Sequence, residues 1–155
     1  MKILALDIAT HTGIAVGSAG RDPQCWSVDL GEGLTEDYRF SEILKLTHGL
    51  IVTHEPDLII CEAFIGAFNR AVSCELVFPA TVRKHFLGKA YTSRDFPGMK
   101  QAKAKIESKK LVKQRAELMG WEIPDLDAAD AAATWDWACA TPVPNFQAKP
   151  VGGLF

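Results

Sequence analysis

Two short apolar runs, each ending in an acid, constrain this 155-residue chain more than any other feature. Residues 3–6 read Ile-Leu-Ala-Leu before Asp7, and residues 58–61 read Leu-Ile-Ile-Cys before Glu62. Such runs are typical of strands buried on both faces of a sheet. If the two strands are adjacent and parallel, their acids meet at the carboxyl edge, where open α/β sheets place their ligand sites.

The segment between these runs predicts a meander followed by a crossover helix. Strands expected at 14–16 and 25–30 follow the first run through turns at 10–13 and 17–23, so the three strands should be antiparallel. A helix is then expected from a Thr35 N-cap to about His54, with Pro56 preventing its continuation. Such a helix is the connection that two parallel strands require.

The second half of the chain predicts one more strand and three helices. We expect, in order, a strand at 73–78, a short helix at 79–86, a loop at 88–98, a long helix at 100–119 and a last helix at 127–140. Gly120 should close the long helix, whose predicted apolar stripe is Ile106, Leu111, Val112 and Leu118. Asp125 could cap the last helix. The predicted fold is α/β with a five-stranded mixed sheet, in one domain over 1–142 followed by a flexible tail over 143–155.

The net charge of −2 conceals a strongly basic segment. Between Arg83 and Arg115 there are eleven Lys and Arg against two acids, a local charge of +9, while the rest of the chain carries −11. Clustered cations of this density are typical of proteins that bind a phosphate backbone. The alternative is a solvated amphipathic helix.

Cysteine spacing and hydropathy argue against several other classes. The four cysteines form no C-x-x-C pair, which disfavours zinc and thiol-redox sites and suits reduced thiols in the cytoplasm. The first apolar run stops at Asp7, so we expect no signal peptide. Since no apolar stretch approaches the roughly 18–20 residues of a membrane span, we expect no membrane partner. No small-molecule cofactor is expected either.

Two further acids, Asp127 and Asp130, stand three residues apart in the last predicted helix and should share one face. Alanines around them would let that face lie close to the sheet. Four carboxylates brought together with Asp7 and Glu62 would repel one another unless cations compensate. Oxygen ligands without a His-Cys cluster favour one or two Mg²⁺ or Mn²⁺ ions over Zn²⁺. Two such ions about 3.5–4 Å apart suit in-line displacement at phosphorus.

Four segments together give the chain a specific resemblance. They read "LALDIATHTGIAVG", "DLIICEAF", "PATVRKHFLGK" and "DLDAADAAATWDWA". In this order they resemble the RuvC family of Holliday junction resolvases, within the RNase H-like superfamily, over roughly residues 1–140. The resemblance implies metal-dependent cleavage of four-way DNA junctions by a homodimer, with Asp7, Glu62, Asp127 and Asp130 as catalytic metal ligands.

The resemblance also suggests contacts to DNA. It places Arg83 near the scissile phosphate, and Lys109 or Lys110 near a second basic position. The full set of expected nucleic-acid contacts is Arg83, Lys84, Lys89, Lys103, Lys109, Lys110, Lys113, Phe64 and Phe68. The two phenylalanines could stack on unpaired bases, worth about 1–3 kcal/mol per base. The alternatives are plain helix surface for the cations and core packing for the aromatics.

The chain departs from the family pattern in two places. Gly13 follows Asp7 by six residues, one fewer than in the common bacterial resolvases, which resembles phage or prophage branches. Only ten residues separate Glu62 from Ser73, where the family has a long helix that contributes to dimerisation. Either that helix is reduced to a turn or two, or residues are missing near Asn69–Ala71, and we favour the second. A direct link would require antiparallel strands.

Three other functions stay open at this point. The acids also fit an RNase H-like nuclease acting on another branched DNA or on structured RNA. A non-catalytic DNA-binding scaffold is a second alternative, although acids that face DNA would weaken its binding unless metal ions occupied them. The run "LDIATHTG" also resembles the first phosphate loop of actin-like kinases, although 155 residues are too few for the two domains that an actin-like ATP-binding module needs.

Overall fold

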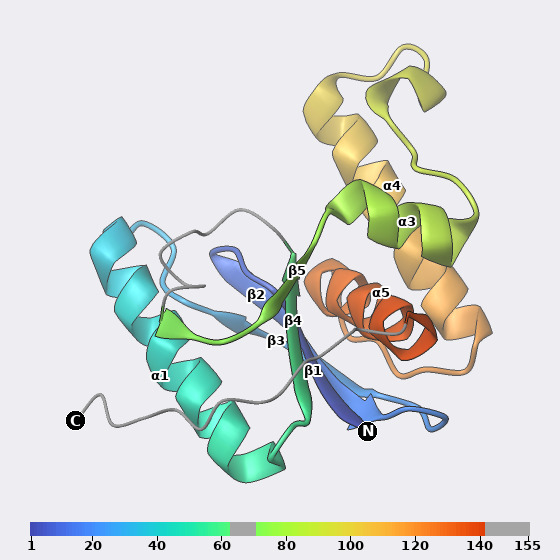
Figure 1. Ribbon diagram of the computed structural model, residues 1–155. Helices are drawn as coiled ribbons and strands as arrows, with labels where there is room; N and C mark the ends of the chain where they lie inside the picture. The colour runs from blue at the N-terminus through green and yellow to red at the C-terminus, as the bar shows by residue number, and fades with distance from the viewer. Residues whose placement is uncertain (63–70, 142–155) are drawn as a thin grey trace.

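The computed structural model describes residues 1–62 and 71–141. Its strands form one five-stranded sheet in the order β3-β2-β1-β4-β5 (Figure 1). The strands are β1 Lys2–Asp7, β2 His11–Ser18, β3 Gln24–Asp29, β4 Leu58–Glu62 and β5 Glu75–Val77. The helices are α1 Glu36–His54, α3 Pro79–Leu87, α4 Gln101–Leu118 and α5 Leu126–Ala140, with a 3-10 turn, η1, at Ser93–Asp95.

The strand directions confirm the predicted mixed sheet. β1, β2 and β3 form the antiparallel meander, and β4 pairs with β1 in parallel. α1 is the crossover that this parallel pair requires. The turn expected over 10–13 is shorter than predicted, because β2 begins at His11 and pairs Gly13 with Asp7.

The pairing of β4 with β5 corrects the expected start of β5 at Ser73, which left only ten linking residues after Glu62. The two strands are parallel, and β5 begins at Glu75, two residues later than the predicted start. The link therefore spans 63–74, which is the dozen residues that a parallel pair needs. Most of this link, including Asn69, Phe64 and Phe68, lies outside the described residues, as does the predicted tail.

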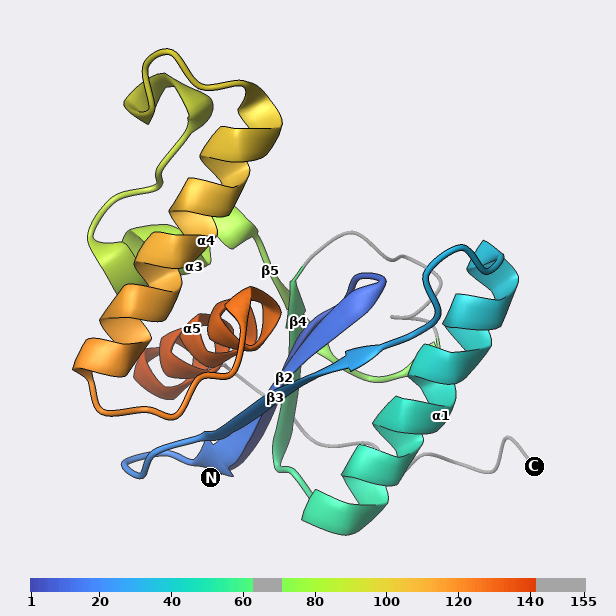
Figure 2. The same cartoon turned by 180° about the vertical axis from the view of Figure 1, so that it is seen from behind.

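Different helices cover the two faces of the sheet. α1 lies against one face, and α5, backed by α3 and α4, lies against the other (Figures 1 and 2). Side chains alternate between faces along a strand. In β1, Ile3 and Ala5 belong to the core under α5. Leu4 and Leu6 belong to the core under α1.

α5 approaches the sheet closely because its inner surface is made of small residues. Its buried alanines are Ala128, Ala129, Ala131, Ala132, Ala133 and Ala138. On the sheet side, a Cβ added to Gly13 would lie 2.0 Å from the backbone oxygen of Asp127. Glycine at this position therefore allows the first turn of α5 to rest directly on β2.

The buried face of α4 differs from the predicted stripe. Ile106 and Leu118 are 47% and 88% exposed, so the expectation was wrong for these two residues, whereas Val112 is buried as predicted. The face that is buried consists of Ala104, Ser108, Val112 and Ala116, spaced four residues apart. Small residues at this spacing let α4 pack against α5, and this choice of face decides which lysines point inward.

The predicted helix caps are confirmed. Thr35 accepts a hydrogen bond from the Tyr38 amide at 3.3 Å. Gly120 follows α4 with φ of 88°, a left-handed conformation that favours glycine. All four cysteines lie in the described part of the chain, and none of them forms a disulfide. Within 1–62 and 71–141, no helix combines the length and apolar character needed to cross a membrane.

Candidate active site

Asp7 and Glu62 end two neighbouring parallel strands on the same side of the sheet. The register pairs Ile3 with Leu58 and continues to Leu6 and Cys61, each of which is followed directly by one of the acids. Asp7 follows the alternation of Ile3 and Ala5, and Glu62 follows that of Leu58 and Ile60, so both acids belong to the face that α5 covers. The predicted meeting of two strand-end acids is therefore present in the fold.

The first turns of α5 bring Asp127 and Asp130 to this edge. Asp125 fixes the start of the helix by accepting hydrogen bonds from the amides of Asp127 at 3.0 Å and Ala128 at 2.8 Å. Asp130 lies deepest, with 2% of its surface exposed. Since Gly13 lies opposite both Asp7 in the sheet and Asp127 in the helix, the close packing at Gly13 sets the approach of these two acids.

Lys109 of α4 lies at the centre of the acids. Its Nζ is 2.6 Å from Asp127 Oδ1, 2.9 Å from Asp130 Oδ2 and 3.3 Å from Asp7 Oδ2. Three carboxylates from two elements therefore surround one positive charge. Burial opposes the charge on Lys109, but attraction to Asp130 and Asp7 and the hydrogen bonds outweigh it and hold the pKa of Lys109 above its usual range.

Lys109 does not fully offset the burial and mutual repulsion of the acids. Burial raises the pKa of Asp7 to about 6, an effect that Lys109 opposes and Asp130 reinforces. Burial, with repulsion from Asp7 and Asp130, raises the pKa of Glu62 to about 8. One lysine is therefore insufficient to compensate all four acids, and the cluster has capacity for further positive charge.

Two more side chains complete the cluster. Arg83 of α3 places Nη2 3.4 Å from Asp130 Oδ2. Thr134 of α5 donates a hydrogen bond from Oγ1 to Glu62 Oε1 at 3.4 Å. Sequence reasoning did not single out Thr134, although it stands four residues after Asp130 and so shares its helix face.

The donor set fits a hard divalent cation, since every acidic ligand offers carboxylate oxygens. Lys109 already marks a point where a cation is stabilised by three of these acids. In the described part of the chain, no group of three or more His, Cys, Asp or Glu side chains is arranged as a ready ion cage. The ammonium group holds the acids in its own geometry, so Asp7, Glu62, Asp127 and Asp130 are the residues that could hold a metal.

The other predicted basic contacts divide into paired and free cations. Lys110 pairs with Glu107 at 2.9 Å, and Lys89 pairs with Asp95. Lys113 is tied to Glu117 at 2.5 Å and to the Ile123 carbonyl at 2.6 Å. Two further cations, Lys84 and Lys103, are exposed. The described residues provide no ion-pair partner for either of these two.

This sheet order, with acids at the ends of the first and fourth strands and on the last helix, defines an RNase H-like fold. Two solved structures share it: RuvC of Thermus thermophilus and the same protein in complex with a Holliday junction substrate. Each matches with a TM-score of 0.55 over 90% of this chain and 96% of the other, at 16% and 17% identity respectively. The chain thus has a RuvC-like fold. No protein-family model and no curated protein matches its sequence.

Proposed function

We propose that this chain is a divalent-metal-dependent endonuclease that resolves four-way DNA junctions. The observation that carries the proposal is the arrangement of Asp7, Asp127 and Asp130 around a single cation, with Glu62 beside them. The likeness to a RuvC bound to a Holliday junction substrate supports the choice of substrate. The charge of +9 between Arg83 and Arg115 supports binding to a polyanion.

The four acids would hold one or two Mg²⁺ or Mn²⁺ ions. When bound, such ions activate water and stabilise the attacking and leaving oxygens at phosphorus. Arg83 and Lys109 are cations on two different helices that already reach the cluster. Each can donate hydrogen bonds to non-bridging phosphate oxygens, which positions the phosphodiester and neutralises charge that develops on it.

Resolution of a junction requires two symmetric cuts. A two-fold dimer that presents two identical sites is the natural device for this, so we propose a homodimer. Sedimentation equilibrium over a range of protein concentrations tests the assembly. A chain that remains at its 16.9 kDa monomer mass both alone and with junction DNA would contradict it.

The test of function is cleavage of a synthetic four-way junction with Mn²⁺, Mg²⁺ or EDTA. The wild type should nick the junction only with metal and in preference to a linear duplex of the same sequence. Asp130→Asn, which keeps the size of the side chain, should lose at least about a thousandfold in rate, or roughly 4 kcal/mol of transition-state stabilisation. Its binding to the junction should remain.

The same assay includes a flap, a replication fork and an RNA hairpin. Faster cleavage of any of these than of the junction would move the function to another branched DNA or to structured RNA. Full activity of Asp130→Asn would show that cleavage does not depend on the acidic cluster, and it would contradict the proposal.

A further inference from the structure

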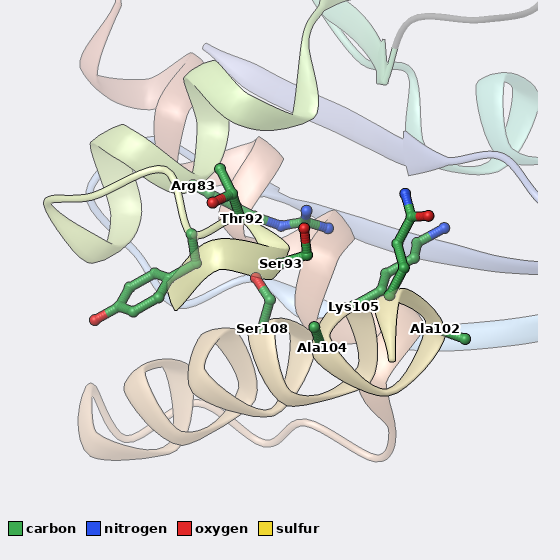
Figure 3. A pocket seen from close by; sticks show the side chains of 9 residues that line it. Arg83, Thr92, Ser93, Ala102, Ala104, Lys105 and Ser108 are labelled. Carbon is green, nitrogen blue, oxygen red and sulfur yellow. The ribbon is translucent and has the colours of Figure 1, made fainter. Parts of the chain in front are cut away.

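A pocket of about 540 Å³ lies between α3, η1 and the N-terminal half of α4 (Figure 3). Its polar lining consists chiefly of Arg83, Thr92, Ser93, Gln101, Lys105 and Ser108. In Figure 3 the Ser108 hydroxyl points from α4 toward the segment that carries Thr92 and Ser93, and the Arg83 guanidinium extends into the same space.

Two polar atoms at this pocket are buried without a partner. Among the described residues, only three buried side-chain nitrogen or oxygen atoms lack a hydrogen bond: Thr47 Oγ1, Arg83 Nε and Ser108 Oγ. The last two belong to residues that line the pocket, and Ser108 is only 3% exposed. A buried unsatisfied group costs about 1–3 kcal/mol. A ligand that accepts hydrogen bonds would satisfy both groups.

The charge of the lining selects an anion. Arg83 and Lys105 are cationic, and none of the described lining residues is acidic. Asp95, on the neighbouring η1 turn, is paired with Lys89. α4 begins at Gln101 without a side-chain cap, so the positive end of its dipole adds to the field. A phosphate group has the charge and the several acceptor oxygens that this lining requires.

Arg83 connects the pocket to the acidic cluster. Its Nη2 faces Asp130 at 3.4 Å, while its Nε has no partner. We propose that the pocket holds a backbone phosphate of the bound DNA strand, next along the strand to the phosphate held at the acids. This inference rests on the proposed nuclease function and adds Lys105 and Ser108 to the residues that hold the substrate.

The test compares Ser108→Ala and Lys105→Gln with Lys45→Gln. Lys45 is a matched control because it lies on α1, on the opposite face of the sheet, and pairs with Glu42. Binding of a fluorescent four-way junction is measured by anisotropy in EDTA over a range of KCl. Ser108→Ala should weaken binding about tenfold. Lys105→Gln should weaken it and reduce the slope of log K against log salt by about 1. Lys45→Gln should change neither.

Thermal unfolding separates a binding role from a structural one. Removing the partnerless hydroxyl should leave the melting temperature of Ser108→Ala unchanged or higher, although DNA binding falls. Unchanged junction affinity in both pocket variants would overturn the proposal. A second arm adds inorganic phosphate at constant ionic strength. If phosphate stabilises the wild type but not Ser108→Ala, while both bind the junction equally, the pocket takes a small phosphate compound and the proposal fails.

The two proposals can fail separately. If pocket variants bind DNA more weakly but the wild type cuts no substrate with Mn²⁺, the phosphate pocket stands and the nuclease function falls. If the wild type cuts junctions and the pocket variants bind them normally, the nuclease function stands and the phosphate pocket falls.

Discussion

The two faces of the sheet differ in function: the face under α1 forms a hydrophobic core, and the face under α5 also carries the acidic cluster. The α1 face is filled by large aliphatic side chains, such as Leu4, Leu6 and Ile43. On the α5 face the covering helix contributes mainly alanines, Gly13 lets the first turn of that helix rest on β2, and Asp7 and Glu62 lie at the edge. Large side chains keep a helix at a distance, whereas small ones let a helix backbone and its acids reach the strand ends. Close packing on the α5 face is therefore what assembles the site.

The largest expected effect concerns the cation on the α5 face. Lys109→Met removes the charge but keeps an unbranched side chain of similar reach. Since two buried acids, Asp7 and Asp130, and the half-buried Asp127 would lose their shared partner, unfolding in EDTA should require about 3–5 kcal/mol less than in the wild type. Mn²⁺ binding, measured by isothermal titration, should tighten because no tethered cation competes. Wild-type stability in EDTA would contradict the central role of Lys109.

On the α1 face the effect should fall on stability alone. Ile43 is 2% exposed in the aliphatic core, so Ile43→Ala should cost about 2–5 kcal/mol. Urea unfolding measures this loss. The cleavage rate per folded molecule, measured well below the new melting temperature, should equal that of the wild type. A thousandfold loss of rate with retained folding would show that the two faces are not separate in function.

The close approach at Gly13 can be tested directly. Gly13→Ala places a methyl group against the Asp127 carbonyl, where backbone must shift. Overpacking of this kind costs about 1–3 kcal/mol. Because the shift moves Asp127 away from Asp7, the cleavage rate should fall by more than stability alone explains. Gly20→Ala serves as the control, since an added Cβ there meets no atom within 4 Å, although its φ of 86° adds some strain.

The last expected effect is a pH dependence of the metal-free protein. The pKa of Glu62 rises from an ordinary 4.5 to about 8 in the folded state. Between these values the folded state retains a proton that the unfolded chain has lost, so stability in EDTA should fall as pH rises through this range and level off above it. Glu62→Gln should flatten the profile measured by urea unfolding between pH 5.5 and 8. Equal slopes in both proteins would refute the assignment.

The strand-end acids were predictable because they depend on local pattern. An apolar run ending in an acid, repeated across a crossover helix, determines both the strand and the edge at which its acid appears. The small residues of α5 likewise indicated a helix that lies close to the sheet. These features need only periodicity and the right-handed crossover rule.

The roles of α4 could not be predicted in the same way. Lysines occur all around this helix, and two of the four residues of the expected stripe, Ile106 and Leu118, are exposed. The buried face, with Ala104 and Ser108, is selected by contact with the neighbouring elements rather than by hydrophobicity. Only that contact decides that Lys109 reaches the acids. The pocket at Ser108 follows from the same choice of face and has no signal in the sequence.

The lysine among the acids also bears on how such a protein is made and stored. Because its own ammonium group neutralises part of the cluster, the chain can complete its fold before any ion arrives. Under the proposed function, chelation should stop junction cleavage without unfolding the chain, and adding metal back should restore cleavage within the time of ion binding rather than of refolding. The supply of metal, and not of newly folded chains, would set how quickly activity appears.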